Sequence, residues 1–78
     1  MKIFGYKGKD TETEGLMEMS DISFSSSPET LRVIAKFLND AAAEIEEMGD
    51  EFGHLHLMDE WEGWEEGTPD IQVINEKI

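Results

Sequence analysis

The sequence predicts an α+β fold, in which one helix packs on an antiparallel sheet of about four strands. Three observations predict it: a long central segment with helical spacing of apolar residues, two strand-like segments before it, and two shorter ones after it. The expected order is β-β-α-β-β. A chain of 78 residues buries only roughly 60% of its unfolded surface, so we expect a single domain over residues 1–78.

The first two strands are predicted at about residues 2–7 and 16–25. Between them the segment KDTETEG is polar and ends in a glycine, which is typical of a hairpin turn. In the second strand the apolar residues change face near Ser20 and Asp21. Such a change predicts a β-bulge or a bend at that point.

The helix is predicted at about residues 28–48. Ser27 is a suitable N-cap, Pro28 suits the first helical position, and Gly49 suits the left-handed residue that follows a helix. Apolar residues at helical spacing form one stripe, which we expect to face the core. They are Leu31, Ile34, Ala35, Leu38, Ala41, Ala42, Ile45 and Met48.

The last two strands are predicted at about residues 52–59 and 70–76. In the first, Leu55 and Leu57 point to one face, whereas His54, His56 and Met58 point to the other. The segment between these strands is rich in Glu, Gly and Trp and is expected to be a loop.

Charge is distributed unevenly along the chain. The sequence has 19 acidic and 6 basic residues, for a net charge of −13, and residues 37–76 contain 13 acidic residues and no basic one. This excess favours a cationic protein as partner over nucleic acid or an anionic membrane, although solubility alone is the ordinary reason for an acidic surface. The chain has no cysteine, and no segment approaches the length of a membrane span. We expect a cytoplasmic protein without a cofactor.

Carboxylates are concentrated at the C-terminal end of the predicted helix. At helical spacing, like charges repel each other, and the helix dipole favours cations at this end. The arrangement therefore lowers stability and is compatible with a surface that meets positive charge. The residues concerned are Glu44, Glu47, Asp50 and Glu51, with Glu46 beside them.

His54 and His56 offer the main alternative chemistry. Two histidines two residues apart on a strand lie on one face, as in some zinc sites. A third ligand would have to be a carboxylate, because the sequence has no third histidine and no cysteine. We therefore prefer a structural role for this pair and keep a metal site as the alternative. No spacing indicates a nucleophile with its base, so an enzyme is not expected.

Trp61 and Trp64 lie in the predicted loop among Glu60, Glu62, Glu65 and Glu66. One interpretation is that an indole folds back and covers the end of a small core. The other is a partner-binding surface, in which the indoles supply apolar contact and the carboxylates attract a basic protein.

The C-terminal third resembles a family of small bacterial immunity proteins from polymorphic toxin systems. The resemblance lies in an HxHL strand, a Trp-containing loop and a final D-I-x-V strand. The matching residues are His54, Leu55, His56, Leu57, Trp61 or Trp64, Asp70, Ile71 and Val73. It implies an α+β protein that binds and blocks a cognate toxin, often a nuclease, and it brings no catalytic residue.

Together these observations predict an intracellular, acidic protein-binding module of the immunity or antitoxin type that inhibits a basic toxin. The predicted partner surface comprises Trp61, Trp64, Glu60, Glu62, Glu65, Glu66, Glu44, Glu47, Asp50 and Glu51. The alternatives are a small metal-binding protein that uses His54 and His56, and an acidic homodimer formed by pairing of an exposed strand.

Overall fold

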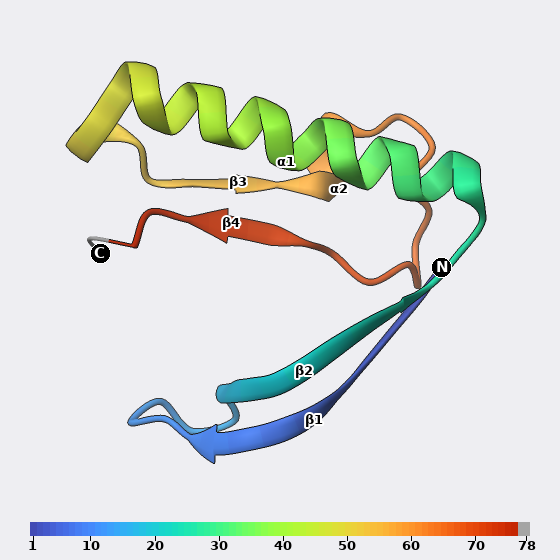
Figure 1. The fold of residues 1–78 in the computed structure, drawn as a ribbon, viewed down its shortest axis with the longest axis vertical. Helices are drawn as coiled ribbons and strands as arrows, with labels where there is room; N and C mark the ends of the chain where they lie inside the picture. The colour runs from blue at the N-terminus through green and yellow to red at the C-terminus, as the bar shows by residue number, and fades with distance from the viewer. Residues whose placement is uncertain (77–78) are drawn as a thin grey trace.

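The computed structural model describes residues 1–76 and has an α+β architecture (Figure 1). This confirms the predicted fold class, with four strands and one main helix. Residues 77–78 of the predicted domain lie outside the described residues. The elements are β1 (Lys2–Asp10), β2 (Met17–Ser25), α1 (Pro28–Met48), the 3-10 helix η1 (Gly49–Glu51), β3 (His54–His56), α2 (Leu57–Glu60) and β4 (Gln72–Ile74).

The prediction of one four-stranded sheet was wrong. The strands form two separate antiparallel pairs, β1 with β2 and β3 with β4. β1 and β2 have nine residues each, whereas β3 and β4 have three each. Within the chain, β2 does not pair with β4, and the β1–β2 hairpin diverges from the rest of the molecule (Figure 1).

The hairpin contains the predicted bulge. Tyr6 is opposite Asp21, but the next residue, Lys7, is opposite Met19, so Ser20 is an extra residue in β2. The Ser20 hydroxyl donates a hydrogen bond of 3.2 Å to the Tyr6 carbonyl, so the side chain of the extra residue bonds to the opposite strand. The change of apolar face in the sequence therefore marks a real bulge.

Helix α1 begins and ends at the predicted residues. The Ser27 hydroxyl accepts a hydrogen bond of 3.2 Å from the Thr30 amide, and Pro28 is the first helical residue. Gly49 has the expected positive φ of 57°, but its ψ of −127° lies outside the left-handed helical region. Its N–H still donates to the Ile45 carbonyl and so closes the helix.

The core lies between α1 and the β3–β4 pair. Ile34, Phe37 and Leu57 form its buried centre. The predicted apolar stripe is therefore partly wrong, because the buried face of α1 is centred closer to Phe37 and the hairpin does not cover the other side. The stripe residues left exposed are Leu31, Ala35, Leu38, Ala42 and Met48.

The predicted strand over residues 52–59 is shorter than expected. Only His54–His56 is a strand, and Leu57–Glu60 forms one helical turn. The Leu57 amide donates to the Ile71 carbonyl at 2.8 Å, and the Met58 amide donates to the Asp70 carboxylate at 2.9 Å. Because residues 70–71 accept both amides, the chain turns away from the β3–β4 pair after His56 without losing these hydrogen bonds. The strand predicted at 70–76 is likewise reduced to Gln72–Ile74.

Across residues 1–76, α1 and the shorter helices all lack the apolar length that a membrane crossing requires.

Candidate partner-binding site

Two adjoining cavities lie between α1 and the β3–α2 segment. Their volumes are about 360 and 250 Å³, and both are lined by Phe37, Asp40 and Glu60. We call the two together the acidic groove. Its further lining residues are Ala43, Glu44 and Leu55 in the larger cavity, and Val33, Lys36, Leu57 and Trp61 in the smaller one.

Carboxylates dominate the rim of the acidic groove. Asp40, Glu44 and Glu60 all line it, and Lys36 binds Asp40 at 2.7 Å. The hydrogen bond to Asp40 raises the pKa of Lys36, so this lysine stays protonated and offsets the Asp40 charge. Glu44 and Glu60 then determine the sign of the local field, which is negative.

Trp61 forms one wall of the groove. Its side chain is half-buried and packs against the core centred on Ile34, Phe37 and Leu57. The indole also lies directly over Gly63, where a Cβ atom would be 2.6 Å from the indole Nε1. Gly63 is therefore needed for the close approach of the ring. The ring therefore covers the core, as the first interpretation expected, and it also lines the groove, whereas its contact with a partner stays a prediction.

Trp64 is also half-buried, and its Nε1 donates a hydrogen bond of 3.3 Å to the Pro69 carbonyl. The loop around it is compact, because the Trp64 amide donates to the Trp61 carbonyl at 3.1 Å and the Thr68 amide to the Glu65 carbonyl at 2.9 Å. Neither indole is sealed inside the core. The neighbouring Glu60, Glu62, Glu65 and Glu66 are exposed.

The remaining acidic residues of the predicted surface are distributed along α1. Glu47 is one turn after Glu44 and two turns after Asp40, so helical spacing puts the three on one flank. Asp50 and Glu51 lie in η1, beyond the C-terminal end of α1 (Figure 1). The structure thus brings Glu44 together with Glu60 in the larger cavity and Glu60 together with Trp61 in the smaller one, whereas Asp50 and Glu51 lie apart from the groove.

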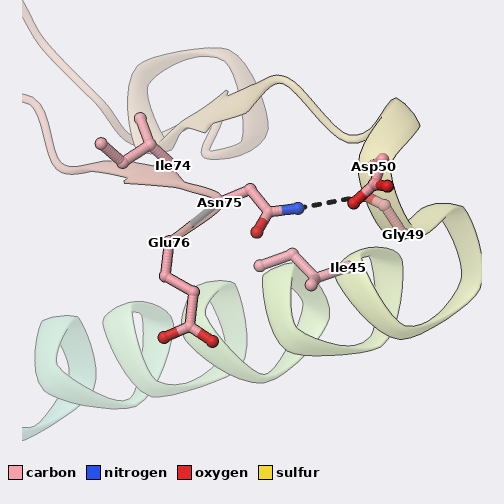
Figure 2. Close-up of a pocket in the computed structure, with 6 residues that line it drawn as sticks. All are labelled: Ile45, Gly49, Asp50, Ile74, Asn75 and Glu76. Carbon is pink, nitrogen blue, oxygen red and sulfur yellow. Dashed lines mark hydrogen bonds between the residues drawn. The ribbon is translucent and has the colours of Figure 1, made fainter. Parts of the chain in front are cut away.

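A separate cavity of about 380 Å³ lies at this end of α1, and we call it the end cavity (Figure 2). Its lining residues are Ile45, Gly49, Asp50, Ile74, Asn75 and Glu76. Asn75 is buried, points toward the helix and donates a hydrogen bond of 3.1 Å to the Gly49 carbonyl. This bond ties the segment after β4 to the end of α1.

The His56 side chain contacts the carboxylate of Asp70. Its Nδ1 is 2.5 Å from the Asp70 carboxylate, and both side chains are only about a quarter exposed, at 27% and 24%. Partial burial alone raises the pKa of Asp70, but hydrogen bonds from His56 and from the Met58 amide outweigh it and hold the pKa below its ordinary value. The His54 ring meets His56 edge-on, with ring centres 4.9 Å apart. Within residues 1–76, His, Cys, Asp and Glu form no group of three or more that could hold a metal ion.

Sequence reasoning missed this His56–Asp70 pair, although both residues were noted. The signal was available in the pairing of the last two strands. β3 and β4 are antiparallel, and His56 at the end of β3 is opposite Gln72 at the start of β4. Asp70, two residues before Gln72, therefore lies near His56.

Comparison with known proteins gives one family. The family model described as immunity protein 32 (Imm32) matches residues 21–77, from the second half of β2 to the end of the last segment. No curated protein and no solved structure matches the chain. A family of immunity proteins implies a toxin-immunity role through binding of a cognate toxin, generally without enzymatic activity. Because the match covers well over half of its residues, the chain belongs to the immunity protein 32 family.

Proposed function

We propose that this chain neutralises a toxin with a basic surface, and that the acidic groove and the adjoining tryptophan loop bind it. The observation that carries the proposal is the half-buried Trp61 indole in the wall of a groove that Asp40, Glu44 and Glu60 also line. Apolar area and negative charge at one place suit a cationic protein surface.

The charge of the chain supports a basic partner. The net charge is −13, and residues 37–76 carry 13 acidic residues without a basic one. A field of this sign attracts positive partners over distances of about 10 Å at moderate salt and raises the association rate. A nuclease toxin fits this description, because its substrate-binding cleft is basic in order to hold phosphates. The carboxylates then occupy the positions that phosphates take in the substrate.

Trp64 supplies the apolar contact next to this charge. Its indole is partly exposed, and it is fixed by the hydrogen bond to Pro69 and by the tight loop. A side chain that is already held in place loses little conformational entropy on binding, which favours affinity. Trp64 is not a member of the buried core cluster, so its truncation tests binding with a smaller effect on folding than truncation of Trp61.

The test is calorimetry with the toxin encoded beside this gene, at several salt concentrations. We expect Trp64→Ala to weaken binding by about 30-fold or more, since the residues that dominate an interface are often tryptophans and cost about 2 kcal/mol or more when truncated. Glu60→Gln should weaken binding and reduce its salt dependence, because one charge of the groove is lost. Glu14→Gln removes the same charge from an exposed turn of the hairpin and is the matched control.

Thermal unfolding of each variant separates loss of binding from loss of fold. The proposal fails if Trp64→Ala binds like the unmodified protein and if the affinity does not change with salt. An assay of nucleic-acid cleavage by the toxin tests whether the partner is a nuclease. Inhibition of cleavage in proportion to the amount of this chain bound to the toxin supports a nuclease partner.

A further inference from the structure

The chain exposes more surface than a closed domain of its size. Its accessible surface is 6269 Å² for a mass of 8.9 kDa, whereas a compact monomer of that mass exposes about 4,800 Å². The radius of gyration of 13.6 Å also exceeds the value of about 11.5 Å for a compact domain of this length. A compact fold of this size would therefore cover roughly 1,500 Å² of surface that this chain leaves open.

The β1–β2 hairpin contributes a large part of the open surface. One of its faces carries Met19, Ile22 and Phe24, with exposed fractions of 41%, 56% and 40%. Ile22 is opposite Gly5, and a Cβ on Gly5 would lie 2.5 Å from the Met19 Cε, which puts Met19 and Ile22 on the same face. This hairpin face is a continuous apolar surface without a covering element among residues 1–76.

A second open apolar surface lies on α1, on the flank opposite Asp40 and Glu44. Leu31, Ala35, Leu38 and Ala42 follow each other at spacings of four and three, and all are exposed. We call these four residues the apolar flank. Ile45 is next to this flank and lines the end cavity together with Ile74 and Asn75 (Figure 2). The apolar flank therefore faces the same side of the molecule as β4.

Both surfaces border unpaired strand edges. Within residues 1–76, β2 pairs only with β1, and β4 pairs only with β3. The two strands run in opposite directions on the two sides of the opening between the hairpin and the body (Figure 1). An antiparallel ladder between a β2 and a β4 would satisfy both edges and would bring the hairpin face toward the apolar flank.

We propose that two copies of this chain form a two-fold symmetric dimer, in which the hairpin of each copy enters the opening of the other. There β2 of one copy pairs with β4 of its partner, and the hairpin face covers the partner's apolar flank. Because every chain carries both surfaces, the contact is made twice and the assembly closes.

Area and charge favour a second copy as the occupant. Covering the open surface of both chains would bury about 2,900 Å² in total, which lies in the range of obligate homodimer interfaces. The hairpin region, residues 1–27, carries three lysines against five carboxylates, whereas residues 37–76 carry 13 carboxylates. The exchange thus brings to the partner a segment that is less acidic than residues 37–76, and it leaves the acidic groove, on the opposite flank of α1, open.

The first measurement is the mass of the full-length protein in solution by light scattering. The expected result is twice the chain mass of 8.9 kDa. Leu38→Glu should shift the protein to monomer, because the new charge lies in the covered apolar flank. Ala43→Glu adds the same charge at an exposed position on the flank of Asp40 and Glu44, which the dimer leaves open, and should leave the dimer intact. A single-chain mass for the unmodified protein at all concentrations overturns the proposal.

Cross-linking then identifies the surfaces. The chain has no cysteine, so Ser23→Cys in β2 and Gln72→Cys in β4 each introduce a unique thiol at an exposed position. An equal mixture of the two single variants, treated with a bismaleimide, should give a covalent pair of the two different chains. Addition of Leu38→Glu to both should abolish this product. The proposal is overturned if the mixture gives no mixed pair. It is also overturned if a variant with both Ser23→Cys and Gln72→Cys is linked only within one chain, since the hairpin then closes on its own body.

Discussion

Asp70 joins three parts of the C-terminal half, and its replacement is the sharpest test of the fold. One oxygen of its carboxylate accepts from the Met58 amide at 2.9 Å, and the other is 2.5 Å from His56 Nδ1. Asp70→Ala removes both bonds and leaves the Met58 amide and the His56 imidazole without this acceptor. The expected loss is about 1–3 kcal/mol of unfolding free energy. The free energy of unfolding of the whole chain is expected to be only about 4–12 kcal/mol.

Urea unfolding followed by tryptophan fluorescence measures this loss. With a slope near 1 kcal/mol per molar, the midpoint should fall by about 1–3 M in Asp70→Ala. Asp70→Asn keeps an oxygen that can accept from the Met58 amide. Its urea midpoint should therefore lie between those of the alanine variant and the unmodified protein. Asp59→Ala removes an exposed carboxylate eleven positions earlier and is the control, with an expected change within about 0.5 kcal/mol.

The effect should depend on pH in a defined direction. Folding lowers the pKa of Asp70 from its ordinary value of 3.8, so the carboxylate form is the one that the fold stabilises. Its contribution is fully present above pH 3.8 and is lost as the pH falls through the lower folded pKa. The difference between the unmodified protein and Asp70→Asn should therefore be largest near neutral pH and shrink in acid. Equal losses in Asp70→Ala and Asp59→Ala, or a difference that grows in acid, would refute this account.

Three further substitutions test other parts of the structure. Leu57→Ala removes the side chain with 0% exposure and should cost about 2–5 kcal/mol in urea unfolding; a cost below about 1 kcal/mol would contradict its central place in the core. Gly63→Ala puts a methyl group 2.6 Å from the Trp61 Nε1, so the indole must move. We expect a shifted tryptophan emission spectrum and weaker toxin binding. An unchanged emission spectrum would show that the ring has room for the methyl group. Ser27→Ala removes the cap of the Thr30 amide and should lower the unfolding free energy by about 0.5–2 kcal/mol, measured by circular dichroism; no change would show that the cap contributes nothing.

Local features of the fold could be predicted from the sequence because they depend on neighbouring residues. The limits of α1 follow from Ser27, Pro28 and Gly49, and the bulge at Ser20 follows from the change of apolar face. These signals act within a few residues, and they need no knowledge of the tertiary structure.

Long-range features were not accessible in the same way. The sequence predicted one sheet, because it shows that strands exist and not which edges meet. The apolar stripe of α1 is wide enough to cover two sides of the helix, so it could not show that Leu31 and Leu38 stay exposed while Phe37 is buried. Likewise, the concentration of carboxylates was evident, but the meeting of Glu44 and Glu60 across the groove depends on how α2 packs against α1.

The double role of Trp61 limits how the surface of this protein can diverge. Since its indole supports the interior and also lines the groove, any replacement of Trp61 that alters the proposed binding of a toxin also destabilises the protein. Glu62, Glu65 and Glu66 are exposed and lack this constraint, so exchanges at these positions change the free energy of unfolding by only about 0.5 kcal/mol or less. A lineage that adapts to a new toxin would thus vary in the loop first and keep the indole.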